Sequence, residues 1–371
     1  MAMPGHDRLK KTMSDLQKLR HARLDHSRRN IGQPVAVFLA VLLAYVGTIA
    51  AALASPLPVA LVLSLLCGIL VVMLFVIGHD ACHQSFTSVA WLNHLIGRIA
   101  FLPTLHVYSL WDYEHNRRHH RYNNIRTLDY AWIPLSPDEF AARGVFGRAW
   151  YRFYRSPLGV PFYYLFELWA QRAIVPRRSL LGTVTWRDVA DAAIMWAGVA
   201  VWAVVIVAAG NWFGKGAPMS LALGLLIPFL VFSAGLSLAI FLHHTHYTVR
   251  WYRTIEEWQH DNGAIHGTVH VEFPWIVRRV ILNIMEHTAH HYAPGVPHYR
   301  LAAMQEEVAH AGGFKWKWSL RGYFRVCDRC KLFDYDRARW MNFRGETTSL
   351  SLRDDTAAND EPRGAPINAS A

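Results

Sequence analysis

Three stretches of this sequence carry histidines at helical spacing. In segment 283–292, His287, His290 and His291 stand at offsets of zero, three and four residues, and an α-helix places residues three and four apart on one face. The other two clusters contain His79 and His83, and His115, His119 and His120. Eight histidines grouped in this way between positions 79 and 291 indicate ligands that folding brings together. We therefore predict one metal centre.

The ligand type narrows the metal and its chemistry. Neutral imidazole suits iron, copper, zinc and nickel, whereas hard cations such as magnesium prefer carboxylates. The eight imidazoles exceed what one tetrahedral ion can use, so the set implies two metals. An all-imidazole set points to the membrane di-iron oxygenases, in which dioxygen is activated to attack an unactivated C–H bond. We therefore expect two iron ions, with dioxygen as a co-substrate.

The composition indicates a membrane protein. Hydrophobic residues make up 53% of the 371 residues and charged residues only 18%, which leaves too many apolar side chains for one globular core. No charged residue occurs in segment 34–78, and this is long enough for two crossings of roughly 20 residues each. The segment is too long for a secretory signal and follows a basic stretch without a cleavage site.

Four spans are expected, in two hairpins. They cover residues 35–54, 57–78, 192–212 and 219–242. The first pair is joined by Ser55 and Pro56, and the loop of the second pair carries the single charge of Lys215. This topology puts every histidine cluster in one compartment, and the arginine-rich central loop makes that compartment the cytoplasm. We therefore predict an all-α integral membrane fold with a helical cytoplasmic cap that holds a histidine-rich di-iron site.

The chain divides into three parts. We expect a basic cytoplasmic segment over 1–33, one membrane domain over 34–343 and a disordered tail over 344–371, where the composition becomes polar. Segment 156–175 is largely apolar, but Glu167, Gln171 and Arg172 favour an interfacial helix over a fifth span. Segment 269–291 is expected to be a helix, interrupted near its start by Pro274.

The net charge of +11 lies mainly in the N-terminal segment, the central loop and the C-terminal third. This pattern does not resemble a groove with stacking aromatics, so we expect no nucleic-acid partner. Attraction to anionic lipid headgroups explains the basic loops better. Cys327 and Cys330 form a lone CxxC, which is weak evidence for a metal site, and ordinary thiols are the simpler interpretation.

The ordered combination of motifs resembles the membrane fatty acid desaturase family, and most of all its acyl-lipid omega-6 branch, found in bacteria and plastids. The strings that carry the resemblance are GHDACHQSF, EHNRRHH followed by TLDYAWIPLSPDEF, HHTHY, GTVHVEFP and NIMEHTAHHYAPGVPHY, within residues 39–299. The resemblance implies a cytoplasmic di-iron centre, the use of dioxygen with two external electrons, and insertion of a cis double bond into an acyl chain.

Matched residue by residue, the resemblance implies metal ligation by the eight histidines of the three clusters. A further family position falls at His244, with His246 as the second choice, and His270 matches the GTVH element. The second cluster departs from many members of the branch, because three residues instead of two separate His115 from His119. That spacing leaves the register of His115 open.

Several other polar residues have both a functional and a structural interpretation. Asp80 could orient a histidine from the second shell, or cap a helix end. Asp129 and Trp132 could position the substrate head or the second cluster, or form a loop turn. A structural or surface role is the simpler interpretation of the remaining histidines: His6, His21, His26, His94, His106, His260, His266, His298 and His310.

The leading functional hypothesis is an acyl-lipid desaturase of the omega-6 or delta-12 type in the inner (cytoplasmic) membrane of a bacterium, with both termini cytoplasmic. A hydroxylase, ketolase or alkane monooxygenase on the same di-iron scaffold is the alternative. A metal-handling membrane protein is a third, which the absence of charge in the apolar runs disfavours. The sequence contains no His-Pro-Gly-Gly element of a fused haem domain, so we expect a separate electron carrier such as a ferredoxin, and a fatty acyl lipid as substrate.

Overall fold

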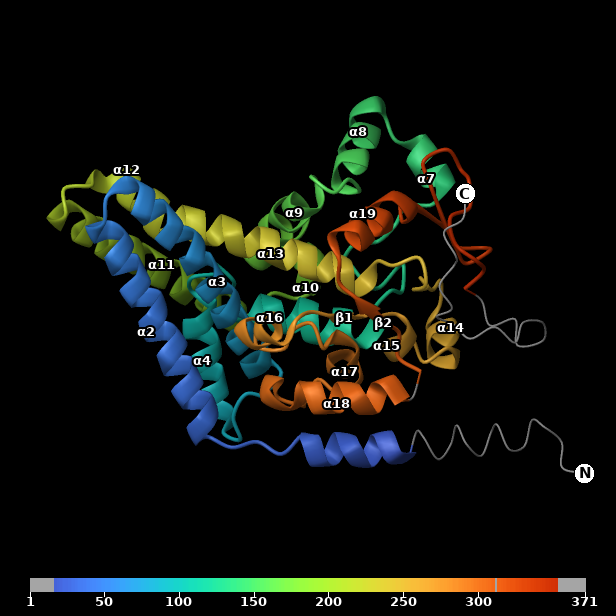
Figure 1. The fold of residues 1–371 in the computed structure, drawn as a ribbon, viewed down its shortest axis with the longest axis horizontal. Coiled ribbons are helices and arrows are strands. Elements are labelled where there is room, and N and C mark those ends of the chain that lie inside the picture. Colours follow the sequence, from blue (N-terminus) through green and yellow to red (C-terminus); the bar gives the residue numbers. More distant parts are fainter. Residues whose placement is uncertain (1–16, 311, 353–371) are drawn as a thin grey trace, which may run out of the picture.

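Four helices in the described part of the chain are long and apolar enough to cross a membrane (Figure 1). The computed structural model describes residues 17–310 and 312–352. The four are α2 (Gly32–Ala54), α3 (Leu57–Cys82), α11 (Trp186–Trp212) and the helix Gly216–His244, which comprises α12 (Gly216–Leu221), η3 (Ala222–Leu226) and α13 (Ile227–His244). The expectation of four apolar helices is confirmed, and each helix is longer than predicted.

The ends of these helices follow from local sequence. The α2 helix stops at Ser55, whose backbone is extended, because Pro56 follows and disfavours a helical residue before it. The α11 helix begins after Thr185, whose backbone N–H donates to the carboxylate of Asp188 at 2.8 Å. The α3 helix continues to Cys82, so His79 lies on the helix itself.

Shorter helices connect the long ones and cover their ends. Between α3 and α11 lie α4 (Ala90–Phe101), α5 (Tyr108–Trp111), η1 (Asp112–His119), α6 (His120–Tyr122), α7 (Pro137–Ala142), α8 (Val145–Tyr154), α9 (Val160–Tyr163), η2 (Tyr164–Ala173) and α10 (Arg178–Leu181). After α13 come α14 (Ile255–His260), α15 (Gly263–His266), α16 (Trp275–Val280), α17 (His287–Tyr292), α18 (His298–His310) and α19 (Leu320–Arg329). Several of these later helices, such as α14, α15 and α19, lie toward the end of α13 that is distant from α12 (Figure 1).

Two small sheets complete the described chain. Strands β1 (His270–Glu272) and β2 (Lys315–Lys317) pair in parallel, and β3 (Leu332–Asp334) and β4 (Arg339–Met341) pair antiparallel. We expected a disordered tail from residue 344, but residues 344–352 run back antiparallel beside β4. There the Thr348 N–H donates to the Trp340 carbonyl at 2.8 Å. The rest of the expected tail, 353–371, and residues 1–16 of the N-terminal segment lie outside the described residues.

The expected single helix over 269–291 is wrong. The segment forms β1, then α16, then a turn, and only then α17. Leu282 and Asn283 in the turn have φ of 51° and 56°, a left-handed conformation that ends a helix. The Asn283 side chain is fixed there because its amide donates to the His298 carbonyl at 2.9 Å. This turn separates α16 from α17 and allows α17 to enter the core.

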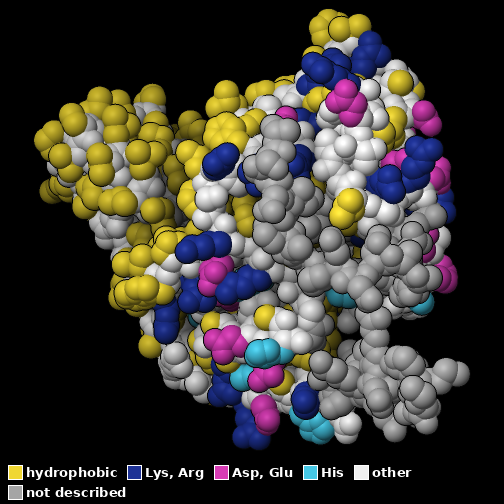
Figure 2. All heavy atoms as spheres, turned by 45° about the vertical axis from the view of Figure 1, so that its right-hand side comes forward, with side chains coloured by type: hydrophobic (Ala, Val, Ile, Leu, Met, Phe, Trp, Pro, Cys, Tyr) yellow, Lys and Arg dark blue, Asp and Glu magenta, His cyan; other side chains and the backbone are white. Residues whose placement is uncertain are grey.

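Two hydrophobic cores meet at α13. The first lies among the long helices and includes Phe75, Phe101 and Phe232. The second includes Trp132 and strand residues such as Trp340 of β4. Segment 156–175, expected as an interfacial helix, forms α9 and η2 and is not among the four candidate spans. In Figure 2 one lobe of the surface is covered by hydrophobic side chains, whereas charged side chains lie over the rest.

Candidate metal centre

Nine buried or half-buried histidines form two groups that could each hold a metal ion. The first group contains His79, His83, His115, His120 and His290, and the second contains His119, His244, His287 and His291. Within each group the candidate ligand nitrogens all lie within 4.8 Å of one another. The structure thus brings together the eight histidines of the three sequence clusters and adds His244 from the end of α13. This division is consistent with the expected centre of two metals.

One turn of α17 serves both groups. His287 and His291 are four residues apart and face the second group, whereas His290 faces the first. All three side chains are at least 95% buried. Because α17 has only six residues, its stability depends on packing rather than on its own hydrogen bonds.

The second sequence cluster lies on a π-helix. In η1 the hydrogen bonds run over five residues, and the His120 N–H donates to the His115 carbonyl. A π-helix has one extra residue in a turn of α-helix, so it brings residues five apart close together on one side. His115 and His120 therefore both reach the first group, while His119 reaches the second. The three-residue spacing that left the register of His115 open is accommodated in this way.

The nitrogen contacts in the first group fit a cation better than hydrogen bonds. Nε2 of His115 lies 2.9 Å from Nε2 of His79 and 3.0 Å from Nε2 of His120, which in turn lies 2.9 Å from Nε2 of His290. The Nε2 of a neutral imidazole carries one proton or one lone pair, so it can form only one such bond. Two of the four atoms have two neighbours each. Four lone pairs directed at one cation would satisfy all of them.

Both groups also contain a buried ring nitrogen without a partner. Nε2 of His83 in the first group and Nε2 of His291 in the second have no hydrogen-bond partner among the described residues. Leaving such a nitrogen unpaired in the interior costs free energy. In the second group, Nε2 of His244 and Nε2 of His287 lie 2.9 Å apart. A metal ion bound by each group would satisfy these atoms.

The protonation state suits metal binding. Burial lowers the pKa of five of these imidazoles well below the usual histidine value, and neighbouring histidines add to the shift: His115, His120, His287, His290 and His291. A histidine binds a metal through its neutral ring. The folded protein therefore holds these side chains in the form that can act as ligands.

Acceptors behind the rings fix which nitrogen faces the metal. Oδ1 of Asp80 accepts from Nδ1 of His79 at 3.2 Å, and Oδ1 of Asp129 accepts from Nδ1 of His119 at 2.9 Å. A carboxylate can only accept, so Nδ1 carries the proton and Nε2 keeps its lone pair. His244 is held in the same way by the side-chain carbonyl of Asn124 at 3.1 Å.

The two aspartates have different surroundings. Oδ2 of Asp80 accepts from the backbone N–H and from Nδ1 of His298, at 2.8 and 3.0 Å. Asp129 also accepts the backbone N–H groups of Asn124 and Tyr130. Burial raises the pKa of the Asp129 carboxyl, but His119, His244 and the Asn124 N–H outweigh it and the pKa is lowered. Of the interpretations open for Asp129, the structure agrees with support of the second cluster.

Two of the expected site histidines lie outside both groups. Thr245 has extended backbone angles and ends α13, so His246 does not follow His244 around the helix and instead contacts Thr248 Oγ1 at 2.7 Å. His270 lies on β1, where its Nδ1 is 2.7 Å from Oε2 of Glu286.

Sequence reasoning gave His298 only a structural role and did not single out Asn124 or His243. His298 is distant in sequence from its partner Asp80, and Asn124 is distant from its partner His244. No spacing in the sequence therefore marks either residue. The ring of His243 stacks on that of His287 at 3.7 Å between centroids. Trp132, the other residue with an open interpretation, stacks on Tyr163 at 3.9 Å between centroids and lies in the second core.

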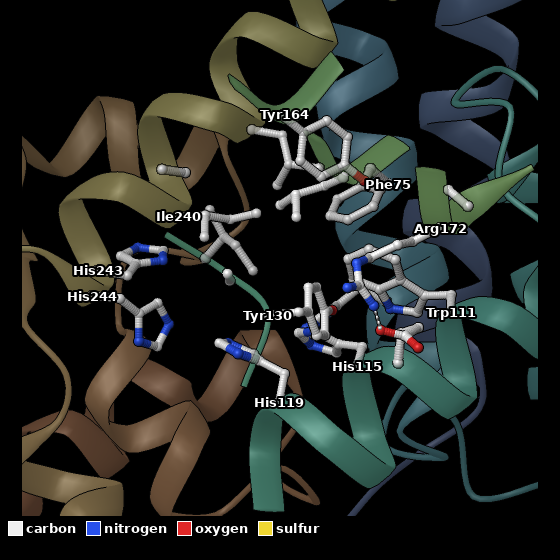
Figure 3. A pocket seen from close by; sticks show the side chains of 18 of the residues that line it. Phe75, Trp111, His115, His119, Tyr130, Tyr164, Arg172, Ile240, His243 and His244 are labelled. Atoms are coloured by element: carbon white, nitrogen blue, oxygen red, sulfur yellow. Dashed lines mark hydrogen bonds and ion pairs between the residues drawn. The ribbon is translucent and has the colours of Figure 1, made fainter. Parts of the chain in front are cut away.

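A largely apolar pocket borders both groups (Figure 3). His79 and His115 of the first group and His119, His244 and His287 of the second line it. The remaining wall is mainly apolar or aromatic: Phe75, Leu110, Trp111, Tyr130, Ala131, Tyr164, Leu168, Ala173, Leu236, Ala239, Ile240 and Ile284. Arg172 and Glu114 also line it and form an ion pair at 2.9 Å. The pocket therefore presents mainly apolar side chains beside both histidine groups.

Four candidate spans and two groups of histidines that could hold metal ions beside an apolar pocket are typical of a membrane protein with a metal-binding site. The model of the fatty acid desaturase family matches residues 54–319, which is more than half of the chain. The protein therefore belongs to the fatty acid desaturase family and is an oxidoreductase of the desaturase type.

Several relatives support the acyl-lipid branch. The chain is 28% identical to the sn-1 oleoyl-lipid 12-desaturase of Picosynechococcus sp., over 70% of this chain and 73% of that protein. It is 30% identical to the protein of the same name from Synechocystis sp., over 70% and 72%. It is 31% identical to the sn-1 acyl-lipid omega-3 desaturase (ferredoxin) of Nostoc sp., over 63% of each chain. The resemblance seen in the sequence motifs is confirmed.

Proposed function

We propose that this enzyme is a di-iron, dioxygen-dependent desaturase that introduces a cis double bond into the acyl chain of a membrane lipid or related fatty acyl substrate, of the omega-6 or delta-12 type. The observation that carries the proposal is that both histidine groups border one apolar pocket. The names of the relatives from Picosynechococcus and Synechocystis support the bond position.

The five histidines of the first group would hold one iron and the four of the second group the other. Iron with dioxygen would supply the oxidant that removes hydrogen from an unactivated carbon. The reaction takes two hydrogens from adjacent carbons and, with two external electrons and two protons, reduces dioxygen to two waters. Neither His246 nor His270 is included in this ligand set, because each lies outside both groups.

The protein's own contribution is to position the chain and exclude water. Phe75, Trp111, Leu236 and Ile240 line the pocket together with five of the candidate ligands, so an acyl chain between them would have few positions available. Water would be displaced by the apolar chain because the wall offers it few polar partners. The pocket would thereby hold the reacting C–C bond beside both sites.

The electrons would come from a separate carrier of the ferredoxin type. The relative from Nostoc carries ferredoxin in its name. Arg117 and Arg121 are exposed on η1 and α6, although Arg117 also pairs with Asp112 at 3.2 Å. Arg118 is less exposed and pairs with Glu114 at 3.2 Å. An acidic carrier would be attracted to the exposed pair. Reversing both charges should raise the ferredoxin concentration needed for half-maximal rate, and an unchanged salt dependence would contradict this docking site.

The membrane topology is part of the proposal. Helices α2 and α3 would form one hairpin and α11 with α12 to α13 the other, in a single desaturase domain over 34–343. The histidine groups and both chain ends would face the cytoplasm, in the inner membrane of a bacterium. The arginines between α3 and α11 support this orientation. A reporter enzyme inserted at Lys215 should be active only on the periplasmic side, and cytoplasmic activity would contradict it.

Expression in a host that lacks polyunsaturated lipids tests the activity. Gas chromatography with mass spectrometry should reveal a second cis double bond in an 18-carbon chain, and the His287→Ala variant should give none. A product that carries an added oxygen would instead identify a hydroxylase or related monooxygenase.

A further inference from the structure

A patch of exposed aromatic side chains lies outside the four candidate spans. It consists of Phe146, Trp150 and Phe153 on α8, Phe162 on α9 and Phe166 on η2, and we call it the aromatic patch. Phe146 is 91% exposed, and Trp150, Phe162 and Phe166 are each at least 45% exposed. In a water-soluble surface such a cluster would be costly, so it marks a surface that something covers.

The patch is continuous across three helices. The ring of Trp150 lies 5.6 Å from that of Phe153 and 6.0 Å from that of Phe166, between centroids, and Phe153 lies 5.8 Å from Phe162. The opposite side of α8 is held by the fold, because Tyr151 and Tyr154 are buried and the Tyr151 hydroxyl donates to the Lys331 carbonyl at 2.8 Å. The α8 helix is therefore a fixed, amphipathic element.

Charge and position favour a lipid surface as the partner. Arg143 and Arg148 stand at the start of α8, and Arg148 donates to the Arg143 carbonyl at 2.8 Å. A helix with aromatic residues on one side and arginines beside them is typical of segments that lie in the membrane interface. Figure 2 shows this arrangement at the top of the molecule, where hydrophobic side chains project above Lys or Arg. Glu167 also borders the patch, and its carboxylate accepts from the Trp150 indole at 3.3 Å.

The patch adjoins both a candidate span and the pocket. Ser237 on α13 accepts the Tyr164 N–H at 3.1 Å and donates to the Val160 carbonyl, so α9 and η2 lie against α13. The next residues of η2, Leu168 and Arg172, line the pocket. A lipid beneath the patch would therefore lie one helix away from the histidine groups.

We infer that the aromatic patch seats α8, α9 and η2 in the bilayer, and that an acyl lipid already in the membrane enters the pocket from beneath these helices. The second part rests on the proposed desaturase function and adds to it the route by which the lipid enters. The seating of α8, α9 and η2 in the bilayer does not depend on the proposed desaturase activity.

Nitroxide labels on the full chain in vesicles of dioleoyl phosphatidylcholine and dioleoyl phosphatidylglycerol test the seating. The four native cysteines are buried, so a cysteine introduced by Phe146→Cys can be labelled selectively. Val204→Cys on the exposed side of α11 is the lipid reference, and Glu306→Cys on α18 is the aqueous reference. Collisions with dissolved oxygen, which partitions into lipid, are compared with collisions with a water-soluble nickel complex.

The label at 146 should behave like that at 204, with frequent oxygen and rare nickel collisions. Behaviour like that at 306 would overturn the inference. Shielding from both reagents would also overturn it, because it would indicate that a second copy or another protein covers the patch.

The entry route has its own test. Phe146→Glu with Phe153→Glu should lower the rate on oleoyl lipid in these vesicles by about tenfold, and should leave the rate on the same lipid dispersed in detergent unchanged. Equal loss in both media, or faster turnover of oleoyl-CoA than of the lipid by the wild type, would contradict entry from the bilayer. If the label result held but no lipid were desaturated by the wild type, the seating of the helices would stand, whereas the proposed function would fail together with the entry route that rests on it.

Discussion

Asp80 holds His298, 218 residues further along the chain, through the backbone N–H at 2.8 Å and the ring Nδ1 at 3.0 Å. The other oxygen of the same carboxylate accepts from His79. One buried side chain thus connects the end of α3 to the start of α18 and fixes the orientation of a candidate ligand.

Replacing this carboxylate should weaken metal binding. In Asp80→Asn the amide oxygen is uncharged and the NH2 group cannot accept, so His79 or His298 loses its partner. Loss of such an orienting group typically reduces metal affinity about 10- to 100-fold. Iron retained after dialysis against a chelator measures the effect. Asp188→Asn, at the start of α11, is the matched control and should retain iron. If Asp80→Asn also retained it, the orienting role would be wrong.

The π-helix η1 makes a prediction about spacing. Deleting Arg117, whose side chain is exposed, would leave two residues between His115 and His119. A regular α-helix could then direct both histidines toward the metal sites. We expect this variant to bind iron. Inserting an alanine after Arg117 should abolish binding, because one extra residue rotates His115 by about 100°. Metal analysis of the two purified variants decides, and equal loss in both would contradict the role of the π-helix.

Filling the apolar pocket with a larger side chain should lower the turnover of the acyl substrate. Ala239 lines the pocket on α13, and Ala239→Trp would place an indole where the acyl chain is expected. Such overpacking costs about 1–3 kcal/mol when a well-packed site must adjust, so turnover of an oleoyl lipid should fall by about tenfold or more. Ala208→Trp, on the exposed side of α11, is the control and should retain activity. Product analysis by gas chromatography measures both, and normal turnover by Ala239→Trp would place the substrate elsewhere.

The lowered pKa values of His115, His120, His287, His290 and His291 predict a pH dependence for the iron-free protein. Unfolded histidines bind protons at a higher pH than these folded ones, so the unfolding free energy falls as the pH drops below about 6.5. Each such group contributes a slope of about 1.4 kcal/mol per pH unit.

Thermal unfolding in detergent at pH 7.5 and pH 5.5 measures this slope. The double variant His115→Gln and His291→Gln should show a smaller loss of melting temperature at the lower pH. An equal loss would mean that these histidines titrate normally in the folded chain.

The sequence was a good guide wherever the signal was local. Offsets of three and four predicted that His287, His290 and His291 share a helical turn, and apolar runs predicted the four long helices. The division of the histidines into groups of five and four depends on how α3, η1 and α17 meet, which local spacing does not encode. His290 and His291 are adjacent in sequence but face different groups.

Backbone breaks account for the wrong expectations. The left-handed residues Leu282 and Asn283 end a helix that the apolar pattern would have continued, and Thr245 directs His246 away from the centre. Long-range partners such as His298 for Asp80 were equally hidden, because a hydrogen bond between distant residues leaves no periodic signal.

The most direct test is the metal content of purified protein, measured together with dioxygen-dependent desaturation of an oleoyl lipid. The wild type and the exposed-histidine control His94→Ala should contain two irons per chain and form the dienoic product. His290→Ala should lose iron and activity together. Wild-type protein without iron, or an active His290→Ala variant, would contradict the account.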